Sequence, residues 1–112
     1  MQTASILVDC QNGLGEGPVW NDKTGALMWV DYHEGLVCSF HLASQKYSAE
    51  KIAETVMVAI PTNRDNLITA VGKRICTYDP NEKKIIKEVI IQENKPDKPN
   101  NAAISRGRFF II

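Results

Sequence analysis

The sequence predicts an all-β fold made of repeated four-stranded antiparallel sheets, which is the architecture of a β-propeller. The turn residues Gly25, Asn66 and Gly107 follow one another at intervals of 41 residues, and an apolar strand pattern follows each of them. Short strand patterns separated by turn signals fill the intervals, and a repeat of about 40–45 residues is typical of a propeller blade. Residues 44–53 are the best helix candidate, and they carry too few apolar positions for a helical period.

Each expected strand is bounded by residues that favour turns. Glycine, asparagine, aspartate and proline occur between the apolar stretches, where they are typical of tight connections. The strands are expected at residues 17–20, 26–30, 36–42, 58–61, 67–71, 74–78, 85–91, 102–104 and 109–112. Because they share one offset in the repeat, residues 26–30 and 67–71 should occupy equivalent positions in adjacent blades.

The whole chain, residues 1–112, is expected to be one partial propeller. At this period it holds about two and a half blades, whereas complete propellers close with about four to eight. We therefore expect the N-terminal blades of a longer propeller, or a truncated product. The apolar pattern at residues 109–112 would then form an unpaired edge, which favours self-association. An unrelated small β-sandwich is the alternative fold.

Composition narrows the classes of function. The chain has 13 basic and 13 acidic residues, so it lacks the excess positive charge that nucleic-acid binding needs. Its apolar runs fall short of the roughly 20 residues of a membrane-spanning helix. The three cysteines, Cys10, Cys38 and Cys76, form no CxxC pair, and no secretory signal precedes them. We expect buried, reduced thiols and a cytoplasmic protein.

Two motifs resemble those of a known family. Residues 15–20 read Gly-Glu-Gly-Pro-Val-Trp, and the strand that follows the next turn ends in Val30-Asp31. Residues 98–102 read Lys-Pro-Asn-Asn-Ala, and a Gly-Arg-Phe-Phe strand follows at residues 107–110. Both patterns, over essentially the whole chain, resemble the senescence marker protein/gluconolactonase/luciferin-regenerating enzyme family, which includes regucalcin.

The resemblance implies a six-bladed propeller that hydrolyses sugar lactones with a divalent cation, usually calcium and alternatively zinc or another metal. It assigns Glu16 as a metal ligand, and Lys98 and Asn100 as substrate-binding residues. In the second motif, lysine replaces the family's arginine, Asn101 its aspartate and Ala102 its glycine. The family's other metal ligands and its proposed base lie in later blades, so no catalytic residue is assigned in this chain.

Two functions follow as hypotheses. The first is the N-terminal part of a metal-dependent lactone hydrolase, inactive as this chain alone because Glu16 is its one convincing carboxylate ligand and calcium takes six to eight oxygens. The second is a non-catalytic calcium-binding or protein-interaction fragment. Asp31 is interpreted as either a turn cap or a site residue, and Trp20 and Trp29 are expected to pack in the core between blades.

Overall fold

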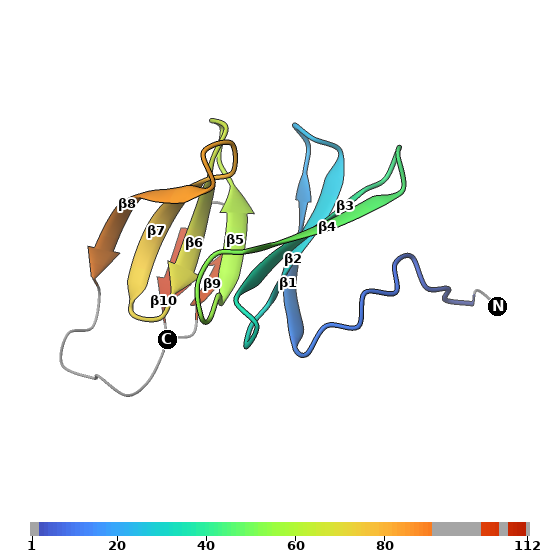
Figure 1. Ribbon diagram of the computed structural model, residues 1–112, viewed down its shortest axis with the longest axis horizontal. Coiled ribbons are helices and arrows are strands. Elements are labelled where there is room, and N and C mark those ends of the chain that lie inside the picture. Colours follow the sequence, from blue (N-terminus) through green and yellow to red (C-terminus); the bar gives the residue numbers. More distant parts are fainter. Residues whose placement is uncertain (1–2, 91–101, 106–107, 112) are drawn as a thin grey trace.

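The computed structural model describes residues 3–90, 102–105 and 108–111, and for the last two stretches it gives the strands alone. Two four-stranded antiparallel sheets stand side by side (Figure 1). The first contains β1 (Gly15–Asn21), β2 (Ala26–Asp31), β3 (Leu36–His41) and β4 (Lys46–Lys51), in that order. Each strand pairs only with the strand that precedes or follows it in the sequence, as in a β-meander.

The second sheet repeats this order. It contains β5 (Val58–Pro61), β6 (Leu67–Val71), β7 (Arg74–Asp79) and β8 (Lys84–Ile90). A separate antiparallel pair follows, made of β9 (Ala102–Ser105) and β10 (Arg108–Ile111). The described residues contain strands and turns and no helix, so none of them could cross a membrane as a helix.

The repeat expected from the sequence is confirmed. The strands β2, β6 and β10 begin at Ala26, Leu67 and Arg108, again 41 residues apart. Both β2 and β6 are the second strand of their sheet, so the equivalence of residues 26–30 and 67–71 is also confirmed. The stretch weighed as a helix contains β4 instead, whose side chains are mostly exposed.

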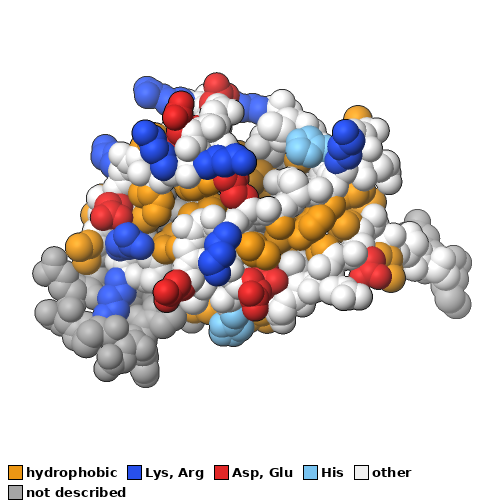
Figure 2. Space-filling view, in the orientation of Figure 1, with side chains coloured by type: hydrophobic (Ala, Val, Ile, Leu, Met, Phe, Trp, Pro, Cys, Tyr) orange, Lys and Arg blue, Asp and Glu red, His pale blue; other side chains and the backbone are white. Residues whose placement is uncertain are grey.

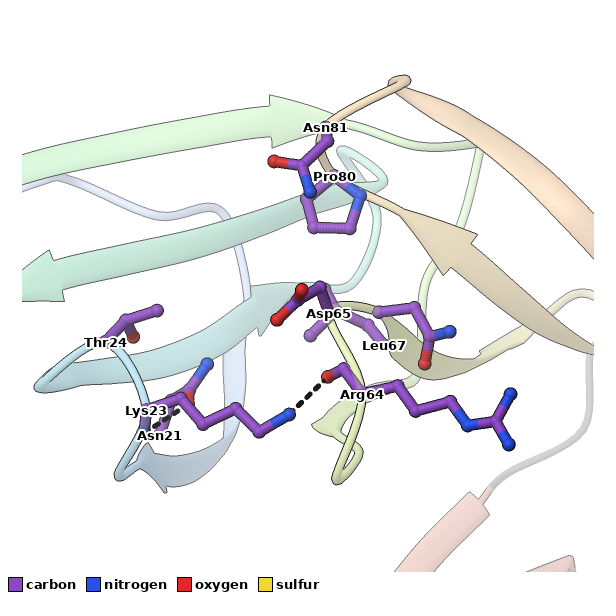
Figure 3. A pocket seen from close by; sticks show the side chains of 9 residues that line it. Asn21, Lys23, Thr24, Arg64, Asp65, Leu67, Pro80 and Asn81 are labelled. Atoms are coloured by element: carbon purple, nitrogen blue, oxygen red, sulfur yellow. Dashed lines mark hydrogen bonds between the residues drawn. The ribbon is translucent and has the colours of Figure 1, made fainter.

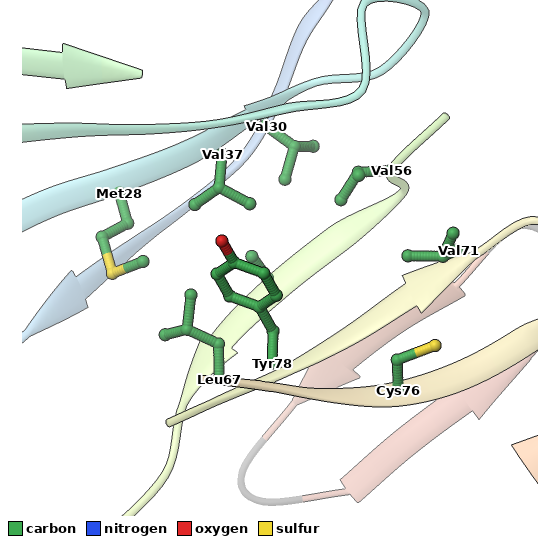
Figure 4. Close-up of a cluster of buried hydrophobic side chains, with 9 residues drawn as sticks. Met28, Val30, Val37, Val56, Leu67, Val71, Cys76 and Tyr78 are labelled. Carbon is green, nitrogen blue, oxygen red and sulfur yellow. The ribbon is translucent and has the colours of Figure 1, made fainter. Parts of the chain in front are cut away.

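The main hydrophobic core lies between the two sheets (Figure 4). Because side chains alternate across a strand, Met28 and Val30 of β2 face the second sheet while Trp29 between them faces away. The cluster between the sheets consists of buried residues from both sides: Met28, Val30, Val37, Val56, Ala59, Leu67, Val71, Cys76 and Tyr78. Burial of this apolar surface holds adjacent blades together.

A second cluster covers the opposite face of the first sheet. It contains Trp29, Cys38 and Phe40, with Val8 and Cys10 of the N-terminal segment packed against it. Trp29 is buried, as expected, but it packs on the N-terminal segment and not between the two described sheets. The expectation for Trp20 is wrong within the described residues, since its side chain is 48% exposed.

Two polar links also join the sheets. Lys23, in the turn after β1, donates from Nζ to the carbonyl oxygen of Arg64 at 2.7 Å, in the equivalent turn of the second sheet. The Tyr78 hydroxyl donates to the Glu50 carboxylate. Burial raises the pKa of Tyr78, and Glu50 raises it further, so the phenol keeps its proton as a donor.

Over the face shown in Figure 2, basic and acidic side chains are interspersed around apolar ones.

Thr69 carries the one buried side-chain oxygen or nitrogen without a hydrogen-bond partner among the described residues. It is fully buried on β6. Thr69→Val should raise the free energy of unfolding by about 1 kcal/mol, because the desolvated hydroxyl is removed while the shape is kept. Urea unfolding measures this change. Thr77→Val, at a half-buried position, is the control, and an equal gain there would contradict the explanation.

Candidate functional site

Glu16 lies near the start of β1, beside a break in the strand pairing. It pairs with Val30 of β2, and the register then shifts before Val19. Gly17 has a φ of 62°, a left-handed conformation that glycine adopts without strain, and Pro18 has no N–H to donate to the ladder. These two residues therefore suit a β-bulge, and bulges re-aim neighbouring side chains. The result is an exposed carboxylate near the start of the first strand of the sheet.

Asp31 anchors the loop that leads to Glu16. Its carboxylate is only 2% exposed and accepts hydrogen bonds from the backbone N–H groups of Gly13, at 2.9 Å, and Leu14, at 3.0 Å. The backbone N–H of Tyr32 donates in return to the carbonyl of Leu14 at 2.9 Å. Of its two interpretations, the structure favours the cap. Asp31 fixes the backbone immediately before Glu16.

Asn12 completes this anchor and was not identified from the sequence. Its Oδ1 accepts a hydrogen bond from Nε1 of Trp29 at 2.6 Å, and its Nδ2 donates to Asp31 at 3.2 Å. A buried indole thus fixes the amide that supports the carboxylate. The Asn12-Gly13 pair just before the motif was a turn signal, but nothing in the sequence pointed to Trp29 as its partner.

The anchor also sets the protonation state of Asp31. Burial raises the pKa of this carboxyl, but the hydrogen bonds from Leu14, Gly13 and Asn12 outweigh it and hold the pKa below the ordinary value of 3.8. Asp31 is therefore ionised at neutral pH. Its oxygens are engaged with these donors, which leaves Glu16 as the exposed carboxylate of the motif.

The described residues supply part of a metal site at most. No group of three or more His, Cys, Asp or Glu side chains within them could hold a metal ion. Calcium takes six to eight oxygen ligands, so Glu16 fits the role of one ligand and not of a whole site. The substrate-binding residues expected at Lys98 and Asn100 lie outside the described residues, as does any spatial relation between Asn100 and Glu16.

A cleft of about 340 Å³ lies at the other end of β1 (Figure 3). Asn21 at the end of β1 lines it, together with polar side chains of the turns after β1, β5 and β7 that include Lys23, Asp65 and Asn81. Lys23 spans it to the carbonyl of Arg64. Because Asn21 is the last residue of β1 and Glu16 lies near its start, the cleft and the carboxylate are at opposite ends of the blade.

The fold and motif define the class of protein. Consecutive four-stranded antiparallel sheets, with the first strands β1 and β5 in contact, are the blades of a propeller-type fold. The chain belongs to the SMP-30/gluconolactonase/LRE-like family, whose model matches residues 14–111.

Two known proteins are similar to this chain in sequence. Regucalcin from Danio rerio is 25% identical, over 96% of this chain and 38% of that protein. L-arabinolactonase from Azospirillum brasilense is 23% identical, over 97% of this chain and 37% of that protein. The chain thus spans less than two fifths of the length of these relatives.

Solved structures confirm the fold. Regucalcin from Agrobacterium tumefaciens, a calcium-binding protein, superposes with a TM-score of 0.78 at 18% identity, over 86% of this chain and 32% of that one. Luciferin-regenerating enzyme superposes with a TM-score of 0.65 at 21% identity, over 80% of this chain and 32% of that one. At these identities the superpositions establish the architecture alone.

Proposed function

We propose that this chain forms part of a divalent-cation-dependent sugar-lactone hydrolase, in which Glu16 supplies one carboxylate ligand to the cation. The observation that carries the proposal is the exposed Glu16 on a bulged first strand, with its preceding loop fixed by the buried Asp31. Membership of the family and the similarity to an arabinolactonase and a calcium-binding regucalcin support it.

The proposed roles follow from the chemistry of lactone opening. A bound cation would polarise the lactone carbonyl towards attack by water. Glu16 would contribute one carboxylate ligand to the cation. The buried Asp31 would keep the backbone before Glu16 in place while negative charge develops on the lactone carbonyl. Lys98 and Asn100 are proposed to contact the substrate, the lysine with a single ammonium in place of a bidentate guanidinium.

The 112-residue chain alone is proposed to lack turnover. Water would have to supply most of the cation's ligands, so the cation would be weakly held. The assay is hydrolysis of gluconolactone with calcium, zinc or manganese. Metal-dependent turnover that Glu16→Gln abolishes would overturn this part, and would imply that several chains assemble a site.

The unpaired thiols Cys10, Cys38 and Cys76 support a cytoplasmic location as part of the same proposal.

The ligand role of Glu16 can be tested separately from activity. Mn²⁺ should broaden the NMR signals of residues 15–17 more than others, because the paramagnetic ion relaxes nearby nuclei. Glu16→Gln should remove this local broadening. Glu82→Gln, in the exposed turn between β7 and β8, should leave it intact. Equal broadening in wild type and Glu16→Gln would contradict the assignment and favour a non-catalytic fragment.

A further inference from the structure

Two thiols lie on either side of the Asn12 amide. The thiol of Cys10 donates to Oδ1 of Asn12 at 3.2 Å, and Nδ2 of the same amide lies 3.6 Å from Sγ of Cys38. Cys10 also packs directly against the cluster of Trp29, Cys38 and Phe40. The two sulfur atoms are thus separated by a single side-chain group, although 27 residues lie between them in the sequence.

The two thiols differ in access to solvent. Cys10 is half-buried and lines an apolar hollow of about 320 Å³, with Ile6, Leu27 and Trp29 among the other lining residues. A small uncharged oxidant can reach Cys10 through this hollow. Cys38 is fully buried on β3, directly opposite Trp29 on β2. Cys76, the third cysteine, lies in the second sheet among apolar side chains of the other core cluster.

The surroundings of Cys38 suit a thiol that reacts second. Burial raises the pKa of the Cys38 thiol, against the opposing hydrogen bonds from Tyr47 and Asn12. Buried thiols of raised pKa are slow to react directly with oxidants in solvent. The Tyr47 hydroxyl lies 3.7 Å from Sγ of Cys38, and burial raises the pKa of Tyr47 to about 12. The protonated phenol can therefore donate to a thiolate that forms transiently.

We propose that Cys10 and Cys38 form a reversible disulfide in response to peroxide. The Cys10 sulfur attacks one oxygen of hydrogen peroxide, and the O–O bond breaks as Cys10 becomes a sulfenic acid. The thiol proton of Cys10 combines with the displaced hydroxide, which leaves as water. The Cys38 sulfur then attacks the Cys10 sulfur, its proton leaves with the hydroxyl as a second water, and the S–S bond forms. Two thiols are oxidised by two electrons, and one peroxide is reduced to two waters.

The disulfide would disturb the anchor below Glu16. A disulfide requires the two sulfur atoms to lie about 2 Å apart, so the Asn12 amide must leave its present position between them. Asn12 would then lose its bonds to Trp29 and Asp31. Gln11, between Cys10 and Asn12, has a φ of 52°, which is uncommon for a residue other than glycine. Rotation of the Gln11 backbone from the left-handed to the extended region would move Asn12 away from the two sulfur atoms. The same rotation would relieve the strain of the positive φ at Gln11.

Peptide mapping of the oxidised chain tests the pairing. After treatment with hydrogen peroxide and blocking of free thiols, trypsin separates the three cysteines because it cleaves after Lys23 and Arg74. The Cys10–Cys38 link should exceed either link to Cys76 by about tenfold in the folded chain, because a disulfide forms only between sulfurs that can approach closely. In urea this preference should collapse, and dithiothreitol should reverse the link.

Single substitutions make the pairing test decisive. Cys76→Ser should leave the link unchanged, whereas Cys10→Ser and Cys38→Ser should each abolish it. A folded chain that yields equal amounts of all three links, or Cys10 oxidised to sulfinic acid without a link, would overturn the proposal.

Fluorescence tests the coupling to Asn12. The chain has two tryptophans, so Trp20→Phe leaves Trp29 as the only tryptophan, whose emission is selected by excitation beyond the tyrosine absorption. Oxidation of this variant should shift the Trp29 emission, because its indole loses the bond to Asn12. The same treatment of Trp20→Phe combined with Cys38→Ser should produce no shift. A disulfide that forms without any change in emission would refute the displacement of Asn12.

Discussion

Gly35→Ala should lower the free energy of unfolding by about 3 kcal/mol or more, which combines a strained backbone with an overpacked site. Gly35 ends the turn before β3 with a φ of 65°, in the left-handed region. A Cβ at this position would lie 1.6 Å from the carbonyl oxygen of Ala53. Because that oxygen belongs to backbone, the segment after β4 must move to make room.

The damage should extend to the core between the sheets. The carbonyl of Gly35 accepts a hydrogen bond from the N–H of Ile52 at 2.9 Å, at the start of the segment that connects the first sheet to the second. The same segment carries Val56, which is fully buried in the core. Displacement of Ala53 should therefore disturb the packing of Val56 in the core between the blades, and not only a surface turn.

Gly25→Ala is the matched control for this substitution. Gly25 has nearly the same φ, 67°, but a Cβ there would meet nothing within 4 Å. The control should cost only about 1 kcal/mol, from the backbone conformation alone. Urea unfolding of both variants measures the difference. Equal losses would show that the close approach of Ala53 contributes nothing.

The fold could be predicted from the sequence because each blade repeats the same pattern of turn residue and apolar strand at a fixed spacing. The strands β2, β6 and β10 were each preceded by a turn residue at the same offset, and their apolar patterns placed them in sheets. The sheet β5–β8 has the same strand order as β1–β4, as equivalent repeats require. The strand β4 was the least evident element, because its exposed, polar outer face carries little apolar signal.

The candidate site was only partly predictable. Glu16 stood out because glycines flank it in a recognisable motif, and the structure adds the bulge at Gly17. The role of Asp31 stayed open because its partners are backbone N–H groups, which every sequence possesses. Asn12 was missed because its partners, Trp29 and Asp31, are distant in sequence and meet only after β2 has paired with β1.

Trp20 shows a further limit of the sequence pattern. A tryptophan within an expected strand suggests a core position, but burial requires a covering element on that side of the sheet. The described residues place none over Trp20, and its side chain stays half-exposed. Trp29 is buried because Val8 and Cys10 of the N-terminal segment fold back over its face of the sheet.

Asp31→Asn should lower the free energy of unfolding at pH 7 by about 2–3 kcal/mol, because hydrogen bonds to a charged acceptor are stronger than neutral ones. The neutral amide keeps one acceptor oxygen for two backbone donors, those of Gly13 and Leu14, and turns its N–H₂ group towards the other. Asp22→Asn, in the exposed turn after β1, is the control and should change stability by less than about 0.5 kcal/mol.

The effect of Asp31→Asn should also depend on pH, with a defined sign. The folded state holds the pKa of Asp31 below 3.8, so below that pH the unfolded chain takes up a proton more readily than the folded one. The stabilisation is therefore complete well above pH 3.8 and is lost as the pH falls through the folded pKa. Urea unfolding at pH 7, 5, 4 and 3 should show wild type and Asp31→Asn converging only below about pH 4. A gap that stays constant down to pH 3 would mean that Asp31 stabilises the loop before Glu16 by packing and not by its charge.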